Sequence, residues 1–129
     1  MRGYLAMTAN EVEEFLKTRT FDVSDIYAPT SAFMTQNPDL DEEEIEYTLT
    51  MIAAEDAVEM KTESTGAAIV LAFEIPDSLI TESHDMSVSL ASELTWDHLE
   101  CAFEVSADGE ELTWFATQEI AQNINEWLG

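Results

Sequence analysis

Two histidines and one cysteine are the residues of this chain whose types could do chemistry. His84 is followed by Asp85, His98 is preceded by Asp97, and Cys101 lies shortly after His98. Imidazole, thiolate and carboxylate groups bind metals such as zinc, and a histidine near a carboxylate can act as a general acid or base. The spacing matches neither CxxC nor HExxH. We therefore favour solvated loop histidines and a buried core thiol, with a small enzyme or metal site that uses His84, His98 and nearby acids as the alternative.

Phosphate-binding motifs are missing from the sequence. The chain contains neither a glycine-rich nucleotide-binding loop nor a nucleophile elbow, and it has only four glycines with which to build one. We expect no cofactor.

The net charge is the outlying property of this chain. Asp and Glu number 28 against four Lys and Arg, so the formal net charge is −24. A field of that sign repels nucleic acid and anionic membrane surfaces, and it attracts basic proteins. We therefore expect no direct binding to nucleic acid or membranes, and a basic protein is the kind of partner that the charge favours.

A candidate acidic interaction surface lies at the start of a predicted helix and along its polar strip. It comprises Asp39, Asp41, Glu42, Glu43, Glu44, Glu55 and Glu59. The same acids suggest a further alternative, a nucleic-acid mimic that inhibits a basic DNA-binding protein. Spread over a folded surface, the carboxylates average one per roughly 240 Å², against one phosphate per roughly 110 Å² of B-DNA. This lower density favours a generally acidic surface over mimicry.

The first half of the chain predicts one short strand and two helices. Residues 4–7 are an apolar run typical of a strand, and Thr8 with Glu11 forms a capping box that predicts a helix over about residues 9–18. Residues 21–38 are irregular, with a short strand near Ile26. Asn37-Pro38-Asp39 opens a second helix that runs from Leu40 to Met60. Its apolar residues occupy two sides, which predicts packing on both.

The second half predicts mostly strands. Residues 67–73 are apolar on both faces, as in an interior strand, and residues 86–90 alternate as in a half-buried one. Asp108-Gly109 predicts a hairpin of residues 101–107 and 111–116, with Phe103 beside Trp114 in the core. Thr117 precedes a last helix. The other tryptophans, Trp96 and Trp127, also lie in apolar patterns and are expected to pack in the core.

This order of elements predicts an α+β fold. We expect a mostly antiparallel sheet of about four to five strands, packed with about three helices. Residues 1–129 are within the usual size of one domain, and no linker divides them, so we expect a single domain.

Three stretches of the chain resemble a family of short, uncharacterised actinobacterial proteins, a domain of unknown function. They are Met1-Arg2-Gly3-Tyr4-Leu5 with Thr8, the acidic start of the long helix (Asp41–Tyr47 with Ala53-Ala54), and Glu111–Glu119. Two departures are Ala6, where the family tends to have Pro, and Ser106-Ala107-Asp108, where it has Val-Asp-Asp. The resemblance implies a bacterial cytoplasmic protein and implies no activity.

Location and function follow from these features as expectations. A single cysteine favours a reducing compartment, and the first residues lack a signal-peptide pattern. The longest apolar run, residues 67–73, is far shorter than a membrane span. The sequence does not define an activity, and we expect a non-enzymatic cytoplasmic protein-interaction domain with a strongly acidic surface.

The charge generates a first prediction, concerning salt. Folding brings like charges closer together, so their repulsion opposes the folded state and weakens as salt shortens the Debye length from about 30 Å at 0.01 M to about 8 Å at 0.15 M. With a net charge of −24, the melting temperature should rise across this range of NaCl. Circular dichroism melts check this expectation. A flat or falling melting temperature would show that the acids are individually solvated.

Overall fold

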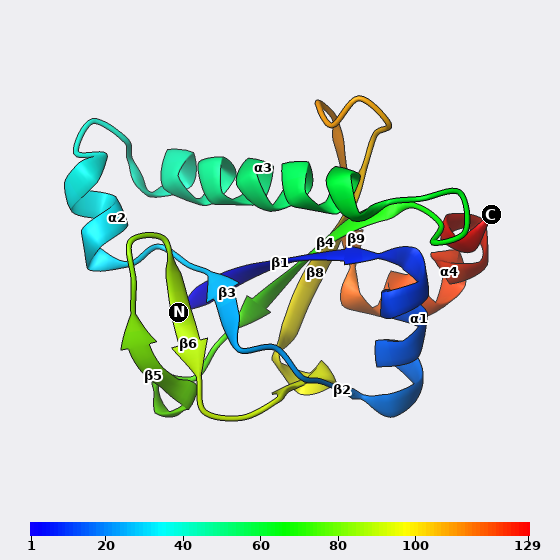
Figure 1. Ribbon diagram of the computed structural model, residues 1–129, viewed down its shortest axis with the longest axis horizontal. Helices are drawn as coiled ribbons and strands as arrows, with labels where there is room; N and C mark the ends of the chain where they lie inside the picture. Colours follow the sequence, from blue (N-terminus) through cyan, green and yellow to red (C-terminus); the bar gives the residue numbers. More distant parts are fainter.

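The computed structural model describes residues 1–129 and contains one large antiparallel sheet (Figure 1). Its seven strands lie in the order β5-β6-β3-β1-β4-β8-β9. Their bounds are β1 (Arg2–Thr8), β3 (Asp25–Tyr27), β4 (Ala68–Glu74), β5 (Ile80–Ser83), β6 (Ser87–Leu90), β8 (Leu99–Val105) and β9 (Leu112–Ala116). A separate ribbon pairs β2 (Thr20–Phe21) with β7 (Leu94–Thr95).

Four α-helices and three short 3₁₀ turns complete the fold. The helices are α1 (Ala9–Thr18), α2 (Ser31–Gln36), α3 (Glu42–Met60) and α4 (Ile120–Leu128). The 3₁₀ turns are η1 (Asp77–Leu79), η2 (Trp96–His98) and η3 (Thr117–Glu119). None of the helices combines the length and apolar character needed to cross a membrane.

The predicted α+β class is correct, but the expected sheet of four to five strands with about three helices is wrong. The structure has seven strands in the main sheet, two more in the ribbon, and four helices. The missed elements carry little hydrophobic signal. Strand β5 reads Ile-Thr-Glu-Ser and is mostly exposed, β2 and β7 have two residues each, and α2 buries only Phe33. Such elements form because their neighbours provide partners, not because their own pattern demands it.

Helix α1 begins and ends where the sequence predicts, because its ends are specified locally. The Thr8 N–H donates to Glu11 Oε1 (3.1 Å), which completes the capping box. Arg19 ends the helix in the left-handed conformation (φ 67°), and its N–H donates to the Phe15 carbonyl (2.7 Å). Val12 and Phe15 are fully buried against the sheet.

Helix α3 begins slightly later than the sequence suggests. Asp41 is the N-cap, and its side chain accepts a hydrogen bond from the Glu44 N–H (2.9 Å) while Glu44 Oε1 accepts from the Asp41 N–H (3.2 Å). This reciprocal pair satisfies the free amides of the first turn better than Asn37-Pro38-Asp39, which forms a turn before the helix.

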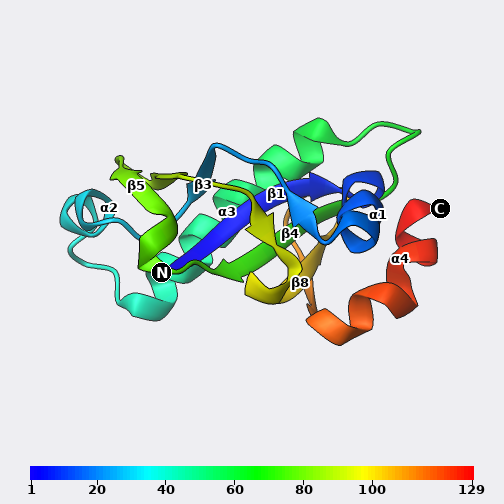
Figure 2. The same ribbon diagram turned by 90° about the horizontal axis from the view of Figure 1, so that it is seen from below.

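The sheet separates two hydrophobic cores. Helix α3 covers one face, while α1 and α4 lie next to each other over one end of the opposite face (Figures 1 and 2). Strand β4 is buried on both faces, as predicted for an interior strand. Its Ala68, Val70 and Ala72 face α3, and the alternating Ile69, Leu71 and Phe73 belong to the opposite core.

The β8–β9 hairpin has the predicted register, with Val105 opposite Leu112, Phe103 opposite Trp114 and Cys101 opposite Ala116. Its predicted burial is wrong for Trp114, which is 58% exposed. Helix α3 lies over β1, β4 and β8, and β9 is the last strand of the sheet, so nothing covers Trp114. Trp127 is buried as expected, and Trp96 is half-buried against Phe15 with ring centroids 5.0 Å apart.

Leu49 in α3 and Leu71 in β4 test the two cores separately, since both are fully buried and they lie on opposite faces of the sheet. Leu49→Ala and Leu71→Ala should each lower the free energy of unfolding by about 2–5 kcal/mol, the usual cost of truncating a buried leucine. Urea unfolding measures the loss, with Met86→Ala at an exposed position (39%) as the control. A loss below about 1 kcal/mol at either leucine would mean that its core is misassigned.

Candidate interaction surface

The seven predicted acids are all exposed, and all lie on α3 or just before it. Glu44, Glu55 and Glu59 line the side of α3 that points away from the sheet, because residues eleven and fifteen apart return to nearly the same side of a helix. Glu44 and Glu55 are separated by about 16 Å along the axis at 1.5 Å per residue. Glu44, Glu55 and Glu59 therefore form an elongated ridge along α3, and the other four acids lie at its N-terminal end.

Two of the seven acids also have a structural role. Asp41 and Glu44 form the capping box of α3, and acids in a first turn interact favourably with the helix dipole. Part of the acidity at this end of α3 therefore stabilises the helix. Glu55 and Glu59, further along the ridge, have no ion-pair or hydrogen-bond partner within the protein.

A groove lies between the flank of α3 and the β8–β9 hairpin, and we call it the α3–β9 groove. It encloses about 200 Å³ and is lined by Arg2, Tyr4, Glu43, Glu46, Tyr47, Thr50, Phe103 and Leu112. Tyr47 stands at its edge with 60% of its surface exposed, and Trp114 follows Leu112 on the same face of β9. Exposed aromatic side chains thus flank a groove that also carries two carboxylates.

The sequence did not reveal this groove. The two-sided apolar pattern of this helix predicts packing on both sides, but on its second side, formed by Tyr47, Met51, Ala54 and Val58, only Ala54 is buried. Tyr47 follows Glu43, Glu44 and Glu46 in the sequence, and an aromatic residue next to several carboxylates is the signal that could have marked an exposed position.

Arg2, which lines the groove, also contacts the only cysteine of the chain. Arg2 Nη2 lies 3.4 Å from Cys101 Sγ, and Arg2 Nε is buried without a hydrogen-bond partner. Burial raises the pKa of the Cys101 thiol, and Arg2 offsets only part of that effect. Cys101 is therefore a buried core thiol, as expected, and remains protonated at neutral pH.

Two tyrosines join the sheet to α3. Burial, followed by the charge of Glu46, raises the pKa of Tyr4 to about 12. The Tyr27 hydroxyl donates a hydrogen bond to Asp56, and this bond, followed by burial, raises the pKa of Tyr27 to about 12. In both cases a phenolate would lie close to a carboxylate, so the neutral hydroxyl is favoured.

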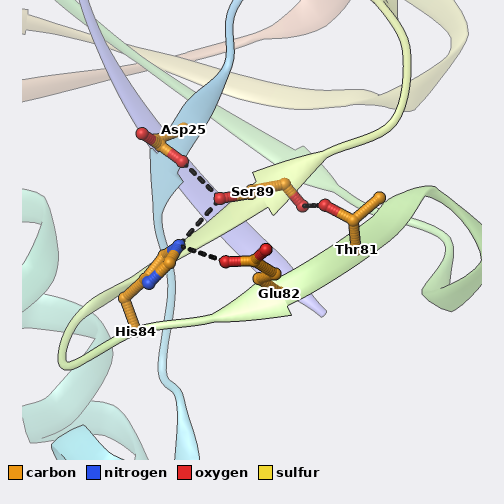
Figure 3. Close-up of polar contacts among 5 residues, drawn as sticks. All are labelled: Asp25, Thr81, Glu82, His84 and Ser89. Carbon is orange, nitrogen blue, oxygen red and sulfur yellow. Dashed lines mark hydrogen bonds and ion pairs between the residues drawn. The ribbon is translucent and has the colours of Figure 1, made fainter.

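His84 belongs to a polar cluster on β3, β5 and β6 (Figure 3). His84 Nε2 lies 2.7 Å from Ser89 Oγ, and Ser89 Oγ donates to Asp25 Oδ1 (2.7 Å). Glu82 Oε2 is 3.9 Å from the same imidazole nitrogen. Serine, histidine and aspartate are present together, but the serine is in the middle.

This order does not activate Ser89. A carboxylate only accepts hydrogen bonds, so the Ser89 hydroxyl hydrogen is directed to Asp25, and His84 Nε2–H must be the donor to Ser89. In a nucleophilic triad the histidine would instead take the proton from the serine and be held by the acid on its other nitrogen. The arrangement links three neighbouring strands at the exposed edge of the sheet.

His98 lies in a different environment and shares no partner with His84. Its Nδ1 accepts from the Thr95 N–H (3.4 Å) and caps the short turn η2. The structure therefore does not bring the two histidines into one site. No group of three or more His, Cys, Asp or Glu side chains is arranged to hold a metal ion.

The fold and surface define an acidic α+β protein, in which an antiparallel sheet carries one long acidic helix and an uncovered aromatic edge. The chain belongs to a family of unknown function (DUF6912), whose model matches residues 1–106. No curated protein and no solved structure matches the chain.

The family match includes two of the three stretches that carry the resemblance. The opening stretch and the acidic start of α3 lie within residues 1–106, while residues 111–119 lie beyond the match. The α3 side of the groove is therefore part of the matched region. Leu112 and Trp114 of β9 lie outside it.

The two raised tyrosine pKa values generate a prediction about alkaline pH. A folded pKa near 12 against an ordinary value of 10.0 means that the unfolded chain loses these protons first. The resulting stability is complete below pH 10 and is lost as the pH rises toward about 12. Urea unfolding between pH 10 and about pH 12 should show that the free energy of unfolding falls as the pH rises. Tyr4→Phe and Tyr27→Phe should each make this slope against pH less steep.

Tyr47→Phe, which changes an exposed tyrosine, is the matched control for both variants. It should leave the slope as in the unsubstituted protein. If Tyr4→Phe and Tyr27→Phe behave like this control, neither hydroxyl is coupled to folding.

Proposed function

We propose that this protein is a non-enzymatic domain of the bacterial cytoplasm that binds a basic protein through the acidic ridge of α3. The observation that carries the proposal is that all seven acids are exposed, five on α3 itself and two, Asp39 and Asp41, in the residues just before it. Helix α3 contains no Lys or Arg, and none of the seven acids forms an ion pair within the protein. The partner is a protein with Lys or Arg on the contacting surface.

The physical basis is electrostatic attraction followed by short-range contact. A surface of one sign steers an oppositely charged partner and raises the association rate, while contributing modestly to the final affinity. The exposed Tyr47 lies on the flank beside the ridge. Its ring offers apolar contact area and a face on which a cation can lie.

A labelled lysine-rich peptide is a suitable probe for the ridge. The variant Glu44→Gln, Glu55→Gln, Glu59→Gln removes three ridge charges, and glutamine at residue 44 still supports the capping box. The control Glu14→Gln, Glu93→Gln, Glu126→Gln removes the same number of charges from exposed positions outside α3. Fluorescence anisotropy at low salt should show that the ridge variant binds roughly three- to hundredfold more weakly, as expected for three exposed ion pairs.

The control variant should lose much less affinity, because it changes the net charge equally but leaves the ridge intact. Equal losses in the two variants would mean that only net charge matters. That result, or failure of the unsubstituted protein to bind the peptide at low salt, would contradict the proposal.

A further inference from the structure

We propose that the outer edge of β9 is a docking edge, to which an extended segment of the basic partner adds as a further strand. This inference rests on the proposed function and specifies how the partner is held. The occupant is a stretch of chain in which Lys or Arg alternates with apolar residues. Four features of the structure support it: open backbone groups, an unprotected edge, an exposed apolar face and the charge around it.

The backbone groups of β9 alternate between β8 and solvent. The Ser106 N–H donates to the Glu111 carbonyl (2.9 Å) and the Glu111 N–H donates to Ser106 Oγ (3.0 Å), so residues 106 and 111 occupy a hydrogen-bonded position at the start of the ladder. Hydrogen-bonded positions occur at every second residue of an antiparallel ladder. The backbone N–H and C=O groups of Thr113 and Phe115 therefore point toward β8. Those of Leu112, Trp114 and Ala116 therefore point outward from the sheet.

Only part of this edge is already occupied. The Ala116 N–H donates to Glu119 Oε1 (2.8 Å), which closes the end of the strand. Because β9 is the terminal strand, the outward N–H and C=O groups of Leu112 and Trp114 face solvent. An added strand would pair with these groups, as in peptide recognition by strand addition.

The two edges of the main sheet differ in their protection. At the β5 edge, the ladder to β6 is interrupted by a register shift between Ile80 and Glu82, and the strand is short and mostly polar. Bulges and charges of this kind are how proteins block unwanted strand pairing. Strand β9 has an uninterrupted register with β8 and carries neither proline nor lysine.

The free face of β9 is apolar and firmly supported. Trp114 is 58% exposed, and beside it the α3–β9 groove places Leu112 and Phe103 opposite Tyr47. On the reverse side, Phe115 packs edge-to-face on the buried Trp127 with ring centroids 5.1 Å apart. The strand is thus held in place, and binding would require little ordering of this edge.

Charge identifies the occupant. Two carboxylates, Glu43 and Glu46, line the groove against one cation, Arg2, and a Lys or Arg stem can lie on an aromatic ring while its charged end reaches a carboxylate. A second copy of this chain would bring another net charge of −24 to the same edge. Repulsion therefore disfavours self-pairing and favours a basic strand.

The test uses a labelled peptide that alternates Val with Lys, and a second peptide in which proline replaces valine so that it cannot pair as a strand. Leu112→Pro removes an outward N–H and leaves the ladder to β8 intact, while Leu112→Ala shortens the same side chain and keeps the N–H. The alternating peptide should bind Leu112→Pro roughly two- to tenfold more weakly than Leu112→Ala, the loss expected for one backbone hydrogen bond. Trp114→Thr should weaken binding at least about fivefold.

Amide hydrogen exchange of the unsubstituted protein provides a readout that needs no variant. The alternating peptide should slow the exchange of the Leu112 and Trp114 amides, and the proline peptide should not. Equal binding of the two peptides, or unchanged exchange at both amides, would overturn the docking edge. A dimer in sedimentation velocity that Leu112→Pro dissociates would show that the occupant is a second copy.

The two proposals fail in different ways. Binding that depends on Glu44, Glu55 and Glu59 but is indifferent to Leu112→Pro would retain the acidic ridge and reject strand addition. Peptide binding that is unaffected both by the ridge variant and by Leu112→Pro would reject the proposed function itself.

Discussion

Ala68, Val70 and Ala72 present small side chains from β4 to α3, while Ile69, Leu71 and Phe73 point from the same strand into the opposite core. The small side chains lie against Ala53, Ala54 and Ala57 of α3, so helix and sheet can pack closely. The larger ones fill the space under α1 and α4. The rest of the structure depends on this double burial of β4, because it holds β1 and β8 on either side and determines which strands α3 can cover.

One helix cannot cover a seven-stranded sheet. Helix α3 lies over the central strands, and both ends of the sheet extend beyond it (Figure 1). At one end, β3, β5 and β6 expose polar residues, including the Asp25–Ser89–His84 cluster (Figure 3). At the other end, β9 exposes Trp114 next to the half-buried Leu112, beside the acidic flank of α3. The two ends therefore differ in chemistry, and the apolar one is suited to a partner.

Helix caps and hairpin register were predictable because they depend on neighbouring residues. The Thr8–Glu11 capping box and the pairing of Phe103 with Trp114 follow from local sequence, and both are present. Helix α3 begins two residues later than predicted because two capping signals compete within a few residues. Asp41 with Glu44 satisfies more backbone amides than Asn37-Pro38-Asp39 does. Strand β5 and helix α2 were missed since each buries too few side chains to leave a periodic pattern.

The sequence by itself determined the α+β class, the charge of −24, the boundaries of α1 and the alternation of the last hairpin, because composition and local periodicity carry these properties. Only the tertiary structure decided that Trp114 is exposed, that Tyr47 borders a groove, and that His84 and His98 lie in separate environments. The reason is physical: alternation shows which side chains share a face of a strand, but burial depends on whether another element covers that face. For Trp114 on β9, no element does.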